Sequence, residues 1–188
     1  MAELKVGRAI GAALHQAISE ILPARVEFYE EWLTLDRIRE GTLSRAKVGA
    51  VLSFLRQEPS GYNEVVGRAG HHTAEWSLDV LPSFRGRLLC QVPLSLRVWG
   101  GLRRGARLIR GLHSDGRLRW TRRRGRVVVT IEGSLFCQVR VHSSAPLCRF
   151  YSTLLERCLE SFEVPCSIES TRCRGVGHEV CEFSIQHK

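Results

Sequence analysis

The spacing of apolar residues between Pro146 and Lys188 constrains the fold more than any other feature of this sequence. Up to Phe162 these residues recur every three or four positions, which places them on one face of a helix. From Val164 onward, apolar and polar residues alternate on both sides of a glycine-containing turn, a pattern typical of two paired strands. The stretch is therefore predicted to form an amphipathic helix followed by a β-hairpin.

This stretch also holds five of the seven cysteines. Cys173 and Cys181 would face each other near the turn of the hairpin, and Cys148 at the start of the helix could reach them. Three converging thiols, with Glu169 and His178 close in sequence, suit a tetrahedral zinc ion, although the spacing is not that of a standard zinc finger. The alternative is that the three cysteines are small buried hydrophobic residues. A disulfide is disfavoured in a chain without a secretion signal.

Three motifs in this stretch, C-x-F-Y, E-x-x-x-C and C-R-G-V-G-x-x-x-C-E-F, resemble the 4-vinyl reductase domain family, which is related to the small TRAPP subunits. The resemblance implies a domain with an internal apolar pocket, and zinc in its phenol-sensing members. The positions that match their zinc ligands are Cys148, Ser170, Cys173 and Cys181. Ser170 replaces an acidic residue, and Glu169 would point to the opposite face of a strand. His178 is therefore the first choice for a fourth ligand, and Glu169 the second.

The remaining pattern predicts an α+β fold, with helices packed on one face of a mostly antiparallel, roughly four-stranded sheet. Helices are expected over 6–22, about 44–57, 62–80 and 94–112, a helix or long turn over 26–35, and a hairpin over 116–132. Residues 1–42 would form an N-terminal helical segment and 43–188 a ligand-binding domain resembling the 4-vinyl reductase family, packed as one unit.

Two further patterns concern the predicted helix over 62–80. Gly67 and Gly70 would let a neighbouring helix approach closely, or leave room for a pocket. His71 and His72 are adjacent and would point about 100° apart, so we do not expect both to hold one metal ion.

Composition limits the compartment and the partners. No apolar run reaches the length of a membrane span. Residues 1–22 are a poor secretory signal, because Glu3 and later polar residues interrupt them, so a cytoplasmic protein is expected. The net charge is +9, and eleven arginines lie between Arg97 and Arg126. On the helix over 94–112 they most often indicate a solvated face, with attraction to an anionic membrane surface or an acidic ligand group as the alternative.

No catalytic motif is visible, whether a nucleophile with its base, a phosphate-binding glycine loop or a dinucleotide fingerprint. Nucleic-acid binding is disfavoured, since aromatic residues make up only 7% of the chain. We therefore expect a non-enzymatic domain that binds an apolar, aromatic, acyl or tetrapyrrole-like ligand in a sensory, carrier or accessory role. Candidate pocket residues, which could equally be plain core, are Trp76, Trp99, Phe136 and Phe150.

Two other functions remain open at this point. The TRAPP resemblance implies an interaction scaffold, and the wide apolar stripe of the first helix would make it a homodimer. The family's name implies an accessory factor in the reduction of a vinyl group on a tetrapyrrole such as a bacteriochlorophyll precursor.

Overall fold

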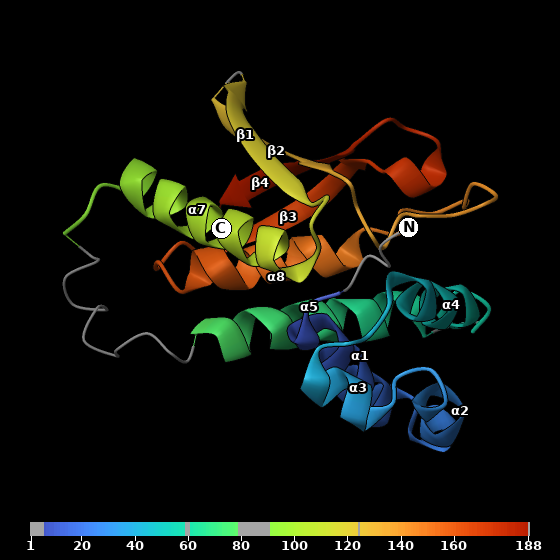
Figure 1. Ribbon diagram of the computed structural model, residues 1–188. Coiled ribbons are helices and arrows are strands. Elements are labelled where there is room, and N and C mark those ends of the chain that lie inside the picture. The colour runs from blue at the N-terminus through green and yellow to red at the C-terminus, as the bar shows by residue number, and fades with distance from the viewer. Residues whose placement is uncertain (1–5, 59–60, 79–90, 124, 188) are drawn as a thin grey trace.

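The computed structural model describes residues 6–58, 61–78, 91–123 and 125–187, with helices first and the sheet late in the chain (Figure 1). The first half contains α1 (Arg8–Ile21), α2 (Val26–Glu30), α3 (Leu35–Glu40), α4 (Arg45–Leu55) and α5 (Tyr62–Leu78). The second half contains α7 (Leu94–Leu112), β1 (Arg117–Arg123), β2 (Arg126–Glu132), α8 (Arg149–Glu160), β3 (Cys166–Arg172) and β4 (Cys181–His187). The predicted α+β class and late sheet are confirmed.

The four strands form one antiparallel sheet in the order β1-β2-β4-β3. At its centre Val129 of β2 stands opposite Trp120 of β1 on one side and Phe183 of β4 on the other. Because successive side chains alternate between faces, Val129 and Phe183 share the buried face, whereas their neighbours Thr130 and Glu182 lie on the more exposed one.

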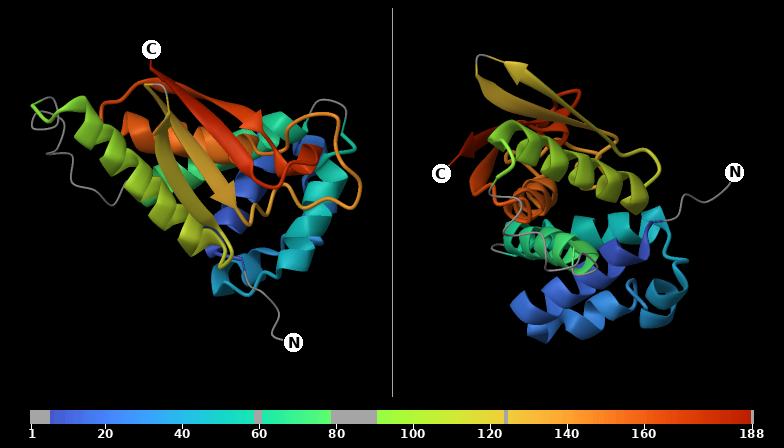
Figure 2. Two further views of the ribbon diagram at one scale, coloured as in Figure 1. Left: turned by 90° about the horizontal axis from the view of Figure 1, so that it is seen from above. Right: turned by 90° about the vertical axis from the view of Figure 1, so that its left-hand side faces the viewer.

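The helices cover one face of this sheet in successive layers. Helices α7 and α8 lie against the strands, α5 lies beneath α8, and α1 packs on α5 with the other N-terminal helices beside it (Figure 2). The structure therefore buries an apolar core on both sides of α8, between it and the sheet and between it and α5.

Helices α5 and α8 approach closely because α5 lacks side chains where they cross. A Cβ atom at Gly70 would overlap the carbonyl oxygen of Phe150 and the hydroxyl of Thr153, whereas a Cβ at Gly67 would come no nearer than 3.4 Å to Arg149. The close helix contact predicted for these glycines is confirmed, and Gly70 is the one on which it depends.

The N-terminal helices correct one expectation. Ile10, Leu14 and Ile18 of α1 are at most 1% exposed, because α5 and the short helices α2 and α3 cover this face within the same chain. The apolar stripe on which the homodimer was predicted is thus part of the core. The homodimer itself stays a prediction, now without that support.

Two other segments complete the comparison with the pattern. The ambiguous stretch over 26–35 contains the one-turn helix α2, and α3 begins at its end. Predictions that fall on 79–90 lie outside the described residues. Within the part of the chain that the structure describes, no helix is both long and apolar enough to cross a membrane.

Candidate metal centre

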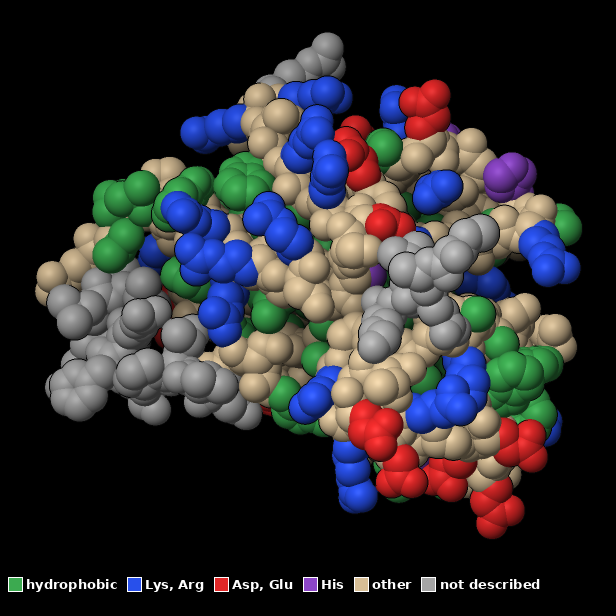
Figure 3. Space-filling model, in the orientation of Figure 1, with side chains coloured by type: hydrophobic (Ala, Val, Ile, Leu, Met, Phe, Trp, Pro, Cys, Tyr) green, Lys and Arg blue, Asp and Glu red, His purple; other side chains and the backbone are tan. Residues whose placement is uncertain are grey.

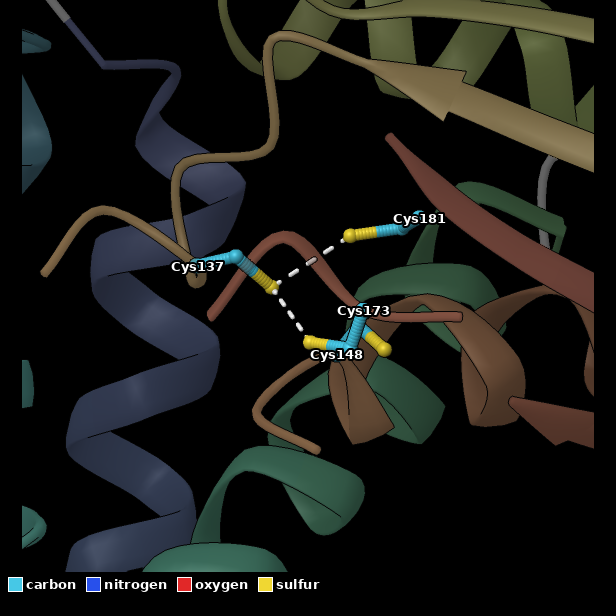
Figure 4. Close-up of side chains that lie close together, drawn as sticks. All are labelled: Cys137, Cys148, Cys173 and Cys181. Carbon is cyan, nitrogen blue, oxygen red and sulfur yellow. Dashed lines mark hydrogen bonds between the residues drawn. The ribbon is translucent and has the colours of Figure 1, made fainter. Parts of the chain in front are cut away.

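Four buried cysteines converge where the sheet meets the start of α8 (Figure 4). Cys137 lies in the irregular segment after β2, Cys148 precedes α8, Cys173 follows β3 and Cys181 opens β4. Each is at most 2% exposed. One sulfur from each lies within 4.8 Å of all the others, so the structure gathers four soft ligands in one small volume.

A β-bulge orients the cysteine at the end of β3. Ser170 pairs with Phe183 and Arg172 with Glu182, so Thr171 is an extra residue on β3. In a regular strand, residues three apart point to opposite faces. The extra residue restores the parity, so that Ser170 and Cys173 both face the helices and Cys173 meets Cys181.

The sulfur separations match a zinc site. A Zn–S bond of about 2.3 Å places the sulfurs of a regular tetrahedron about 3.8 Å apart. Cys137 Sγ lies 3.5 Å from both Cys173 Sγ and Cys181 Sγ. These distances exclude a disulfide between those pairs, because an S–S bond measures about 2.05 Å.

Donors around the cluster favour thiolates. The backbone N–H groups of Leu147 and Arg174 donate to Cys173 Sγ at 3.3 Å and to Cys181 Sγ at 3.5 Å. Hydrogen bonds from the neighbouring thiols, that of Cys137 first, hold the pKa of Cys173 and the pKa of Cys181 below a thiol's ordinary value. Such outer donors are the usual companions of thiolate ligands to a metal.

The structure corrects the predicted fourth ligand. Cys148, Cys173 and Cys181 meet as expected, but Cys137 joins them, while His178 is exposed and lies outside the group. Glu169 is also exposed, and it accepts a hydrogen bond from Gln186.

Ser170, at the family's acidic position, contacts a ligand instead of serving as one. Its Oγ lies 3.1 Å from Cys148 Sγ. A thiolate at Cys148 would accept a hydrogen bond from this hydroxyl, so Ser170 would hold the Cys148 sulfur in place without binding the ion itself.

Sequence reasoning missed Cys137 because it belongs to no regular element. The signal that could have revealed it is the glycine just upstream. Gly133 has a φ of 68°, a left-handed conformation that turns the chain after β2. The next apolar run, Leu135 to Cys137, is then buried beneath the sheet.

The four predicted pocket aromatics occupy different environments. Phe136 and Phe150 are fully buried and stack on each other with ring centroids 4.1 Å apart. Trp76 and Trp99 are 40% and 46% exposed. The structure thus does not gather the four around one cavity, and Phe136 and Phe150 match the alternative of plain core packing.

An apolar groove lies instead between α7 and the tip of the β1–β2 hairpin. It has a volume of about 380 Å³, and its lining includes Leu94, Val98, Trp99, Trp120, Arg122 and Val127. Arg103 stacks over the Trp99 ring at 4.8 Å from its centroid. Of the predicted pocket residues, only Trp99 lines this groove.

Comparison with known families concerns the segment that holds the thiol cluster. The family model of the 4-vinyl reductase domain matches residues 127–187, which include all four cluster cysteines. This segment is a 4-vinyl reductase domain. The predicted resemblance to that family is confirmed over these residues. No curated protein shows significant similarity to the chain.

Solved structures extend the comparison of fold beyond the 4-vinyl reductase domain. An H-NOX protein from S. oneidensis in the Fe(II)NO ligation state is 14% identical with a TM-score of 0.60, over 97% of this chain and 99% of that chain. The phenol-responsive sensory domain of the transcription activator PoxR, solved with phenol, is 15% identical with a TM-score of 0.54, over 77% and 75%. At these identities the likeness shows a common fold.

Proposed function

We propose that this chain is a non-enzymatic, small-molecule-binding sensory or carrier domain whose 4-vinyl reductase segment is fastened by a structural zinc ion. The observation that carries the proposal is the convergence of four buried thiols from four separate parts of that segment. Four protein ligands leave a tetrahedral zinc ion without an open position, which is the mark of structural sites. Cys137, Cys148, Cys173 and Cys181 would hold the ion, and it would lock the irregular chain before α8 to the hairpin.

The ligand-binding part of the proposal draws on the groove between α7 and the hairpin. Its volume falls in the range of about 300–1,000 Å³ that is usual for small-ligand sites. Trp99 and Trp120 offer aromatic surface, and Arg122 offers a positive charge with no ion-pair partner among the described residues. We therefore expect a small aromatic ligand with an acidic group. The phenol bound in the similarly folded PoxR domain is consistent with an aromatic ligand.

The iron of the H-NOX structures is not part of this proposal. Among the histidines whose burial is described, only His113 lies in the core, and its Nε2 already bonds to the Tyr151 hydroxyl at 3.0 Å. Its side chain therefore belongs to a hydrogen-bonded core pair.

Zinc content tests the structural part. Protein purified without chelator is expected to hold about one zinc per chain, measured by inductively coupled plasma mass spectrometry. Cys137→Ser should lower that content and the thermal midpoint together, because metal binding is coupled to folding. The matched control is Cys158→Ser, since Cys158 is also buried but lies outside the cluster. Full zinc content in Cys137→Ser, or its loss in His178→Ala, would contradict the assignment of ligands.

Calorimetric titration with benzoate and phenol tests the ligand part. We expect saturable benzoate binding that Trp99→Ala abolishes and Arg122→Ala weakens, with a smaller effect of Arg122→Ala on phenol because phenol is neutral. Trp76→Phe is the control, because Trp76 is similarly exposed but lies outside the groove lining. Equal binding by Trp99→Ala and the unaltered chain would refute the groove as the site.

The same surface supports a second candidate, attachment to an anionic membrane. Basic side chains gather over α7 and the hairpin (Figure 3). An exposed stripe along α7, at helical spacing, comprises Leu96, Trp99, Arg103, Arg107 and Arg110. Such a mixture of apolar and cationic residues suits an anionic lipid surface. Co-sedimentation with phosphatidylserine vesicles, but not phosphatidylcholine vesicles, would favour this candidate, and Arg107→Glu should then reduce binding.

A further inference from the structure

A second group of metal-ligating side chains lies on α5, outside the 4-vinyl reductase domain. Its members are His71, His72 and Glu75, which each bring one ligand atom within 4.8 Å of the other two. The carboxylate oxygen Oε2 of Glu75 lies 3.7 Å from His71 Nδ1 and 4.0 Å from His72 Nδ1. These distances are too long for hydrogen bonds but close to the separation of atoms that share an ion.

This arrangement corrects the expectation that adjacent histidines cannot share a metal. The Cβ atoms of His71 and His72 do diverge around the helix. However, Nδ1 is the ring nitrogen nearer the backbone, and Glu75 follows the two histidines by four and three positions, respectively. Side chains at these spacings meet on a helix surface, so one carboxylate oxygen reaches both rings.

The ring of His72 is held in the form that a metal needs. Its Nε2 lies 3.1 and 3.2 Å from the two carboxylate oxygens of Glu20 on α1. A ring nitrogen that faces a carboxylate carries the proton, which leaves the lone pair on Nδ1. That Nδ1 atom is buried and has no hydrogen-bond partner, and the same is true of His71 Nδ1.

Neighbouring contacts fix the other parts of the group. Glu20 accepts a hydrogen bond from Gln16 at 2.9 Å and pairs with Arg68 at 3.3 Å, and these contacts keep it ionised. The Trp76 ring stacks on His72 with centroids 5.3 Å apart. The second oxygen of Glu75 lies 3.6 Å from the Arg157 guanidinium, which leaves Oε2 facing the histidines.

We propose that His71, His72 and Glu75 form a second metal site, for a borderline divalent transition ion such as Zn²⁺ or Ni²⁺. Ligand atoms about 2.1 Å from a tetrahedral ion lie about 3.4 Å apart, so the side chains need to close by only a few tenths of an ångström. Two neutral imidazoles and one carboxylate are ligands that such ions accept. The Glu20 carboxylate behind His72 is the partner that a metal-bound histidine normally has.

Three protein ligands on a partly exposed helix leave a fourth position open to solvent. The site thus differs in kind from the closed thiol cluster. It would bind an exchangeable ion, and it would couple that ion through Glu20 to α1 and through Arg157 to α8.

The test is a calorimetric titration of untagged, zinc-loaded full chain with Ni²⁺. We expect one saturable Ni²⁺ equivalent that also quenches tryptophan fluorescence, because Trp76 stacks on a ligand. Trp76→Phe should remove most of the quenching while leaving the binding. His71→Ala, His72→Ala and Glu75→Gln should each weaken binding at least 10-fold, and Glu20→Gln by about 10–100-fold, as for other carboxylates that orient a metal-bound histidine.

Two controls separate this site from other sources of binding. Glu64→Gln changes a carboxylate on the same helix outside the group and should leave the affinity unchanged. Cys137→Ser should also leave it unchanged, so the result does not depend on the thiol cluster. Absence of saturable Ni²⁺ binding to zinc-loaded protein, or unchanged affinity in a folded His71→Ala/His72→Ala variant, would overturn the proposal.

Discussion

Gly70 is the residue on which the packing of α5 against α8 depends, and replacing it with alanine tests that packing directly. An alanine Cβ would overlap the backbone carbonyl oxygen of Phe150 and would stand 3.0 Å from its carbonyl carbon. A helix backbone cannot rotate away as a side chain can, so the two helices must move apart.

The expected magnitude is the difference of two effects. Overpacking of a tight contact costs about 1–3 kcal/mol. Alanine is favoured over glycine inside a helix by about 0.5–1 kcal/mol, which offsets part of that cost. Gly70→Ala should therefore lower the free energy of unfolding by about 1–2 kcal/mol, or the thermal midpoint by about 2–8 °C for a chain of this size.

Gly49→Ala is the matched control. Gly49 lies inside α4, and an added Cβ would meet nothing within 4 Å. Only the propensity effect remains, so this variant should be more stable by about 0.5–1 kcal/mol. Urea unfolding followed by circular dichroism measures both. If Gly70→Ala proves as stable as the unaltered chain, or if Gly49→Ala destabilises it, the packing argument is wrong.

Two further substitutions probe the core around α8. Burial lowers the pKa of His113 to about 4 from 6.5, so the folded state holds the neutral ring. Stability from this residue is complete above pH 6.5 and is lost as pH falls towards 4, by up to about 3 kcal/mol, and His113→Gln should flatten that part of the pH profile. Tyr62→Phe removes a buried hydroxyl 3.2 Å from the Phe136 carbonyl and 3.0 Å from the Leu147 carbonyl, and should cost about 1–3 kcal/mol in urea unfolding; no loss would show that these carbonyls are satisfied otherwise.

Much of the fold follows from periodicity. Apolar residues at helical spacing predicted α1, α4, α5 and α8, and strict alternation predicted both hairpins. The covering of α1 could not be read in the same way. An apolar stripe records that a face is buried, but not whether α5 of the same chain or a second copy buries it.

The candidate site shows a similar division. Cys173 and Cys181 were predictable as a facing pair because strand alternation and the glycine turn fix them locally. Cys137 and the position of Ser170 were not, since one lies in an irregular segment and the other depends on the bulge at Thr171. Alternation presumes an unbroken register, and a single extra residue reverses it.

The thiol cluster has a direct connection to the helices of the first half. Phe136 and Leu147 each immediately precede a cluster cysteine, and the Tyr62 hydroxyl at the start of α5 reaches both of their carbonyls. Arg56, just after α4, donates to the same Phe136 carbonyl at 2.9 Å. A zinc ion at the thiols would therefore fix the chain positions on which α4 and α5 rest. Because α5 also bears His71, His72 and Glu75, any shift of this helix that follows metal loss at the thiols would move those ligands with it.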